Sequence, residues 1–181
     1  MSNLFPPSSD VGEILISESE IASRVAELGA QIANDHEGST PILVAILKGS
    51  VVFVADLIRA VPGPVEVDFM AVSSYGSGVK SSGVVKIIKD LDRNVTGRDV
   101  ILVEDIIDSG LTVQYLLKHF ESQRPASLKI CTLLLREDES RPDMKIDYVG
   151  FELPPAFVIG YGLDVDQAYR NLPYIARYAN E

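Results

Sequence analysis

Two short, unbroken apolar runs constrain the fold more than any other feature of the sequence. Residues 41–47 read P-I-L-V-A-I-L and residues 100–103 read V-I-L-V, without the polar alternation of a strand that has one face in water. Runs of this kind are typical of strands in a parallel sheet that is covered on both faces. Each run is followed by a break and then by a helical pattern, which predicts an α/β fold with a mainly parallel sheet.

The other periodic segments supply the helices and further strands of such a fold. Ser17 and Glu20 form a capping box, which predicts a helix that begins there and runs to about residue 35. A second helix is expected after residue 50, with Val51 and Ala55 among its inward residues, and a third over residues 111–120. Further strands are expected at residues 13–16, 65–72, 84–88, 127–135, 148–151 and 157–161.

The length of 181 residues and the apolar fraction of 46% fit one domain with a sizeable core, and we expect residues 1–181 to form a single domain. Ligands of open α/β sheets bind beyond the carboxyl ends of the strands. Functional residues are therefore expected at Lys48, in residues 104–112 and after Leu135.

The charge of the chain limits its partners. The net charge is −10 at pH 7, which disfavours non-specific binding to nucleic acid. A small phosphate ligand can still bind where amides, lysines or a divalent cation cancel the local charge. The single cysteine, Cys131, excludes an internal disulfide, and its apolar surroundings in the sequence predict a buried strand residue.

Neither a leader peptide nor a membrane anchor is predicted. The first ten residues contain no lysine or arginine and no long apolar stretch, so they do not resemble a signal peptide. The longest apolar run of the chain is far too short to span a bilayer. We therefore expect a soluble, cytoplasmic protein with neither a membrane nor a nucleic acid as partner.

The segment V-I-L-V-E-D-I-I-D-S-G-L-T carries the strongest chemical signal. An apolar strand runs into Glu104 and Asp105, which can accept hydrogen bonds from vicinal hydroxyls or hold a metal through water. Asp108 follows, and the turn of Ser109 and Gly110 then opens a helix whose first amides offer a site for a phosphate. Gly110 lets the backbone approach a ligand closely because it has no Cβ.

This segment has two other interpretations. It could be an acidic turn in which Asp108 or Ser109 caps the helix. Paired acids after an apolar strand also bind magnesium in receiver domains of response regulators, but there the pair lies on the first strand, and here about a hundred residues precede it. The sequence contains neither a Walker A motif nor the G-x-G-x-x-G fingerprint of dinucleotide-binding folds.

Residues 103–112 resemble the phosphoribosyl-pyrophosphate-binding motif of type I phosphoribosyltransferases. Further segments in matching order extend the resemblance to the hypoxanthine-guanine branch of that family over about residues 11–178: 47–50 (L-K-G-S), 73–76 (S-S-Y-G), 149–154 (V-G-F-E-L-P) and 158–164 (V-I-G-Y-G-L-D). The resemblance implies the type I phosphoribosyltransferase fold, a mainly parallel sheet flanked by helices, with a small hood built from N- and C-terminal segments.

The resemblance also implies a role for each residue of the central segment. Glu104 and Asp105 would hold the ribose hydroxyls and an associated Mg²⁺ ion, and Asp164 would bind a second magnesium ion. Asp108 would act as general acid/base at purine N7. The residues implied to cradle the 5-phosphate are Asp108, Ser109, Gly110, Leu111 and Thr112.

Two loops and a lid complete the implied site. Lys48 and Gly49 correspond to the family's pyrophosphate loop, in which the peptide before the lysine is often cis. Arg170 corresponds to an arginine that contacts pyrophosphate, an anion that suits its planar fork. Ser74 and Tyr75 would form the tip of a lid that keeps water from a ribosyl cation-like transition state.

The purine side of the implied site departs from the family at one position. Phe157 would stack on the base, and Val158 would read its edge through a backbone group. The family usually has a lysine that donates to the purine 6-oxygen, and this sequence has Arg136 there. Arginine also donates to carbonyl oxygens, as when proteins read guanine, but it does not replace lysine neutrally. The preference among hypoxanthine, guanine and xanthine therefore stays open.

The resemblance thus implies an enzyme that transfers the 5-phosphoribosyl group of phosphoribosyl pyrophosphate to N9 of hypoxanthine or guanine. It would need Mg²⁺ and would release pyrophosphate and inosine or guanosine monophosphate, in purine salvage. A homodimer or homotetramer is expected. Two alternatives remain: a phosphoribosyltransferase for another base such as xanthine, and a non-catalytic nucleotide-sensing regulator, against which the acidic charge counts.

Overall fold

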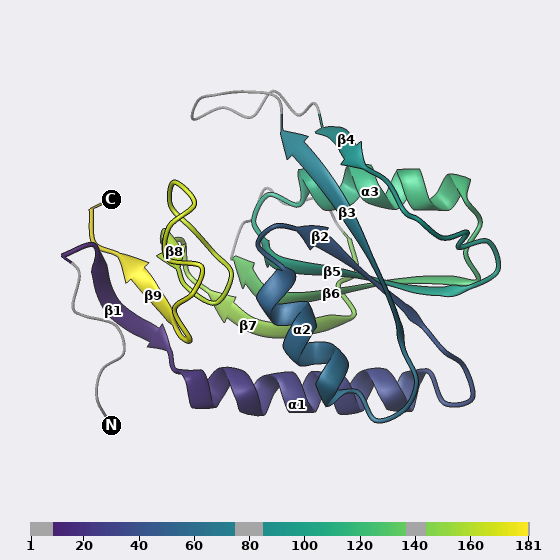
Figure 1. Ribbon diagram of the computed structural model, residues 1–181, viewed down its shortest axis with the longest axis horizontal. Helices are drawn as coiled ribbons and strands as arrows, with labels where there is room; N and C mark the ends of the chain where they lie inside the picture. Colours follow the sequence, from purple (N-terminus) through teal and green to yellow (C-terminus); the bar gives the residue numbers. More distant parts are fainter. Residues whose placement is uncertain (1–8, 75–84, 137–143, 181) are drawn as a thin grey trace.

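A six-stranded, mainly parallel sheet forms the centre of the protein in a computed structural model that describes residues 9–74, 85–136 and 144–180 (Figure 1). The strand order is β4-β3-β2-β5-β6-β7, and only β4 runs antiparallel to its neighbour. In the order of the chain these strands are β2 (Ile42–Leu47), β3 (Glu66–Ser74), β4 (Val85–Lys89), β5 (Asp99–Ile107), β6 (Ser127–Arg136) and β7 (Tyr148–Leu153).

Helices cover both faces of this sheet, as the unbroken apolar strands predict. Helices α1 (Glu18–Asp35) and α2 (Val51–Ala60) pack on one face, where β2 contributes Leu43 and Ala45. Helix α3 (Leu111–Ser122) packs on the other face, where β2 contributes Val44. Successive side chains of a strand point to opposite faces, so a strand with a helix layer on each side must be apolar at every position.

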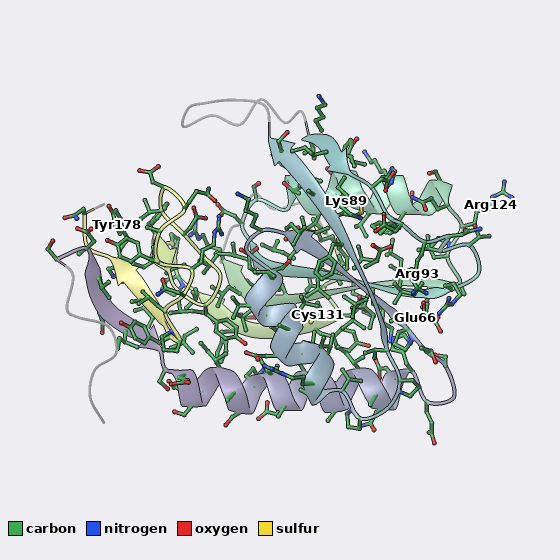
Figure 2. The ribbon with its side chains drawn as sticks, in the orientation of Figure 1. Glu66, Lys89, Arg93, Arg124, Cys131 and Tyr178 are labelled. Carbon is green, nitrogen blue, oxygen red and sulfur yellow. The ribbon has the colours of Figure 1, made fainter. Side chains whose placement is uncertain are left out.

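Cys131 of β6 is fully buried, as the sequence predicts, and Figure 2 places it in the middle of the molecule. Burial raises the pKa of its thiol, so the residue is a poor nucleophile. No helix in the described ranges is long and apolar enough to cross a membrane.

The first helix begins as the capping box predicts. The hydroxyl of Ser17 accepts from the Glu20 amide at 3.3 Å, and the Ser17 amide donates to the Glu20 carboxylate at 2.9 Å. The phase predicted for α2 is wrong in part, because Val51 and Ala55 are exposed. The residues that α2 buries are Phe53, Val54 and Leu57.

A separate three-stranded antiparallel sheet, in the order β1-β9-β8, forms the expected hood. It joins β1 (Val11–Ile16) with β8 (Val158–Ile159) and β9 (Ile175–Tyr178). Figure 1 shows β1 and β9, from opposite ends of the chain, side by side near the arrowheads of β6 and β7. Strand β9 was not predicted.

Strand β5 is longer than predicted. It continues past Glu104 to Ile107, and its last residues pair with Leu134 and Leu135 of β6. Glu104 and Asp105 therefore lie on the strand, with side chains on opposite faces, and not in the loop after it. The turn that follows is correspondingly short, since α3 begins at Leu111.

Candidate active site

The carboxyl ends of β2, β5 and β6 lie at one edge of the sheet, because the three strands are parallel and adjacent. Two glycines let the loops at this edge touch. A Cβ on Gly49 would lie 1.5 Å from the Asp105 Oδ2 atom, and one on Gly162 would lie 2.1 Å from the Gly49 carbonyl oxygen. A side chain at Gly162 would push the two loops apart, and one at Gly49 would displace the Asp105 carboxylate, so segments distant in sequence meet here.

The two acids of β5 are unusual because they are carboxylates in a buried place. The Glu104 residue is only 6% exposed, and burial raises its pKa well above the usual range, with a further contribution from the charge of Asp105. Burial also raises the pKa of Asp105, although the Ile106 amide donates to its Oδ1 atom at 3.0 Å and lowers it. A cation bound here would favour the ionised form of both acids.

The turn after β5 presents amides without a side-chain cap. Gly110 has φ of +73°, the left-handed conformation that favours glycine, and it stands at the N-cap of α3. Neither Asp108 nor Ser109 caps the helix, so the interpretation as a capped acidic turn is wrong. The N-terminal amides of α3, beginning at Leu111 and Thr112, are available to an anion.

Lys48 and Arg170 bring cations to the same edge. The Leu47–Lys48 peptide is cis, which is often so in the family that the sequence resembles. The Lys48 Nζ atom donates to the Gln167 Oε1 atom at 3.0 Å. The Arg170 guanidinium donates to the Gly162 carbonyl at 2.7 Å and pairs with the Asp164 carboxylate at 2.6 Å. Arg170 and Asp164 also affect the pKa of Asp105, lowering and raising it respectively, so these charges lie close to the acids of β5.

Arg136, at the end of β6, connects the turn after β5 with the segment before β8. Its Nη1 atom lies 3.1 Å from the Asp108 carboxylate, and its Nη2 atom donates to the Ala156 carbonyl at 2.7 Å. The next residue, Phe157, is 39% exposed, and its ring centroid lies 5.6 Å from that of Tyr178. Tyr178 belongs to β9 of the hood (Figure 2). This arrangement offers a donor for a carbonyl oxygen beside an exposed aromatic face.

Of the two predicted lid residues, the structure describes only Ser74. Ser74 is the last residue of β3, at the same edge of the sheet. Tyr75 lies outside the described residues. Val158 is buried in β8 and pairs with Arg177 of β9, which fixes the strand that follows Phe157.

The carboxylates of the site fit a magnesium ion that takes most of its ligands from elsewhere. No group of three or more His, Cys, Asp or Glu residues in the described ranges could hold a metal alone. Mg²⁺ usually keeps several waters and takes one or two carboxylates together with substrate phosphates. Asp105 and Asp164 supply such oxygens near each other. Burial raises the pKa of Asp105, and a bound cation would favour its ionised form.

A cavity of about 550 Å³ lies elsewhere, between α1, α2 and residues 170–173, and is lined mostly by aliphatic side chains. Its lining includes Arg170 but neither Glu104 nor Asp105. We place the active site by its amides, cations and acids, because a phosphate ligand requires such groups.

The sequence does not predict two contacts of the site. Gln167 contacts Lys48, and the Ala156 carbonyl accepts from Arg136. A backbone carbonyl leaves no signal in a sequence. Gln167 gives a weak signal, because it lies three residues from each of two predicted site residues, Asp164 and Arg170.

Comparison with known families decides where the chain belongs. Residues 12–166 match the model of the phosphoribosyl transferase domain. The chain belongs to this phosphoribosyltransferase family. Among curated relatives, a hypoxanthine-guanine phosphoribosyltransferase of Bacillus subtilis is 52% identical over 92% of this chain and 92% of its own length. One of Mycobacterium tuberculosis is 49% identical over 96% of this chain and 88% of its own.

A solved structure agrees with the phosphoribosyltransferase assignment. The crystal structure of a hypoxanthine-guanine phosphoribosyltransferase from Bacillus anthracis superposes with a TM-score of 0.89 at 48% identity, covering 93% of this chain and 99% of that one. The type I phosphoribosyltransferase fold with its N- and C-terminal hood is therefore confirmed.

Proposed function

We propose that this phosphoribosyltransferase joins the 5-phosphoribosyl group of phosphoribosyl pyrophosphate to N9 of hypoxanthine or guanine, forming inosine or guanosine monophosphate and pyrophosphate. The observation that carries the proposal is the sequence of groups along one edge of the sheet: buried acids on β5, uncapped amides on α3, and Arg136 next to an exposed aromatic. These groups match, in this order, a ribose, a phosphate and an oxopurine.

The ribose phosphate would bind at the end of β5. The backbone amides of residues 109–112 and the Thr112 hydroxyl would hold the 5-phosphate, because Gly110 allows close approach and the helix N-terminus favours an anion. Glu104 and Asp105 would accept hydrogen bonds from the ribose hydroxyls. These contacts would fix the anomeric carbon relative to the base.

The pyrophosphate would lie between Lys48, Gly49 and Arg170. Lys48 and Arg170 supply positive charge, and the Gly49 backbone supplies a close approach without a side chain. Glu104 and Asp105 would hold one Mg²⁺ ion next to the ribose hydroxyls, and Asp164 would hold a second. When bound, the metal would offset the charge of the departing pyrophosphate.

The base would lie between Phe157 and the turn after β5. Phe157 would stack on the purine, the Val158 backbone would read its edge, and Arg136 would donate to its 6-oxygen. Asp108 would take the proton from N7 as N9 attacks the ribose, because its exposed carboxylate faces the same space as Arg136. Ser74 and Tyr75 would close over these groups and exclude water.

The test is nucleotide formation from phosphoribosyl pyrophosphate and magnesium with hypoxanthine, guanine, xanthine and adenine in parallel. We expect product with hypoxanthine and guanine and none with adenine, which lacks the 6-oxygen. Folded protein that forms no nucleotide with any of the four bases would refute the proposal.

The role of Arg136 is tested in the same assay. The change Arg136→Met should lower kcat/KM for hypoxanthine by about 10- to 100-fold, the effect of losing a hydrogen bond from a charged donor. Arg136→Lys keeps one donor and should fall between wild type and Arg136→Met. Arg124→Met is the matched control, because Arg124 is exposed at the far end of the molecule (Figure 2). Equal activity of the methionine variant and wild type would exclude Arg136 from the base site.

A further inference from the structure

The turn between Asp164 and Arg170 contains several residues in the unfavourable left-handed backbone conformation. Asp166, Gln167 and Tyr169 all have positive φ values, of 50°, 68° and 72°. Each non-glycine residue in the left-handed region costs about 1–2 kcal/mol. Backbone of this kind persists where the surrounding structure requires it, and it is frequent at ligand sites. The turn is closed by hydrogen bonds between the backbones of Val165 and Ala168.

This backbone conformation places Gln167 between two cations. Its Oε1 atom accepts from the Lys48 Nζ atom at 3.0 Å and from the Arg170 Nη2 atom at 3.4 Å. Lys48 follows β2, more than a hundred residues away in the sequence, and Arg170 follows the turn itself. A single neutral oxygen therefore joins the two positively charged side chains of the proposed pyrophosphate site.

The other polar groups of Gln167 hold the turn to a carboxylate. Its backbone amide donates to the Asp164 Oδ2 atom at 2.8 Å, and its side-chain Nε2 atom lies 3.5 Å from the same oxygen. Asp164 in turn pairs with Arg170. Because Gln167 itself is exposed, it contributes little to the core, and its contacts are instead with charged groups of the site.

We infer that Gln167 is a positioning residue of the pyrophosphate site, whose amide oxygen holds Lys48 and Arg170 close together in the empty enzyme. This inference rests on the proposed function for the identity of the anion. Two like charges repel, and an acceptor between them lowers that cost without neutralising either one. When an anion arrives, a phosphate oxygen replaces the amide oxygen, and both cations are already in place to bind it.

Two substitutions of nearly equal length probe the amide oxygen. Gln167→Met removes the oxygen, and Gln167→Glu keeps an oxygen at the same reach but adds a negative charge between the two cations. Both are unbranched at Cβ, as glutamine is, so the cost of the left-handed backbone is similar in all three proteins. We expect Gln167→Met to raise KM for phosphoribosyl pyrophosphate and the inhibition constant of pyrophosphate by about 10- to 100-fold, the range for hydrogen bonds to charged groups. Its KM for hypoxanthine should stay within about twofold. Gln167→Glu should also raise both constants, because its carboxylate pairs with the two cations and opposes the incoming anion.

The matched control is Asp166→Asn, one position earlier in the same turn. In the described part of the chain the Asp166 side chain makes no hydrogen bond or ion pair, and asparagine tolerates positive φ. This variant should keep the wild-type KM for phosphoribosyl pyrophosphate. Thermal unfolding of the wild type and the three variants should give similar Tm values, which would show that the substitutions do not disrupt the fold.

Direct titration with magnesium pyrophosphate measures the affinity of the site for the anion and so tests the inference without turnover. If the wild type forms no nucleotide but Gln167→Met still binds pyrophosphate more weakly than wild type, the proposed function fails and the inference stands. If nucleotide forms but Gln167→Met binds pyrophosphate within twofold of wild type, the inference fails and the function stands. Wild-type binding of pyrophosphate by Gln167→Glu would also overturn the inference, because the added charge would then not lie between the two cations.

Discussion

Asp108 differs from the other acids of the site in its surroundings. Glu104 and Asp105 are enclosed and have raised pKa values, whereas Asp108 is exposed in a turn and lies 3.1 Å from the Arg136 guanidinium. A group that exchanges a proton with a substrate must be able to touch it. Asp108 meets this condition, because its side chain is exposed beside Arg136.

The substitution Asp108→Asn tests this role at the scale of one residue. Asparagine keeps the shape and can still accept from Arg136, but it cannot take a proton from N7. We expect kcat to fall by ~10²–10⁴, with little change in KM for phosphoribosyl pyrophosphate. Glu121→Gln, which removes one exposed carboxylate at the far end of α3, is the control. Unchanged turnover in Asp108→Asn would remove Asp108 from the chemistry.

At the residue scale the sequence predicted the acids and the turn better than their partners. The pattern of an apolar strand, two acids and a Ser-Gly turn identifies positions 104–112 because each residue type serves a backbone or charge requirement there. The pairing of Arg136 with Asp108 and of Gln167 with Lys48 depends on how loops pack across the sheet edge. Such contacts join residues far apart in the sequence, and no local pattern encodes them.

At the scale of elements, the site depends on the contact between the loop after β2 and the loop after β8. Gly162, with φ of +100°, lies against the Gly49 carbonyl oxygen, and a Cβ there would approach to 2.1 Å. Gly63 has a similar φ of +113° but has no atom within 4 Å of such a Cβ. Both glycines therefore have a positive φ that disfavours other residues, but only Gly162 has neighbouring atoms that a Cβ would clash with.

Replacing each glycine by alanine separates these effects. Gly63→Ala should lower the free energy of unfolding by about 1–2 kcal/mol, the cost of a left-handed residue, and should leave kcat/KM unchanged. Gly162→Ala should cost more and should also lower kcat/KM by about 10²-fold, because it displaces the two loops that carry the cations. The measurements are chemical unfolding and steady-state kinetics. Equal kcat/KM in the two variants would mean that the loop contact has no part in catalysis.

The differences between the structure and the sequence pattern also lie at this scale. Almost every residue of helix α2 is apolar, so periodicity alone does not distinguish the exposed Val51 from the buried Phe53. Strand β9 has only four residues, which include Arg177 and Tyr178, and it forms by pairing with β1 and β8. Strand β5 continues through two acids that are typical of a loop. In each case tertiary pairing outweighed the local signal.

At the scale of the whole molecule, charge sets the conditions for ligand binding. The chain carries a net charge of −10, and its proposed substrate is itself a polyanion. The order of strands and helices was predictable because two-sided apolar strands permit only a covered, mainly parallel sheet. How such an acidic protein tolerates an anion was predictable only in outline, since it depends on where the few cations gather. In the structure Lys48 and Arg170 stand next to Asp164 and near Asp105, so the site itself is close to neutral until a metal arrives.

This balance predicts that phosphoribosyl pyrophosphate stabilises the protein strongly only together with magnesium. A ligand at 100 times its Kd adds about 2.7 kcal/mol to the free energy of unfolding, which raises Tm by about 5–10 °C in a protein of this size. If chelation with EDTA weakens binding about 100-fold, the same ligand concentration adds only ~0.4 kcal/mol, or about 1 °C. Thermal unfolding with ligand, with magnesium, with both, and with sodium chloride at equal ionic strength distinguishes these cases. An equal rise in Tm with and without EDTA would mean that Lys48, Arg170 and the α3 amides suffice to bind the substrate, and that the buried acids of β5 are retained for the ribose alone.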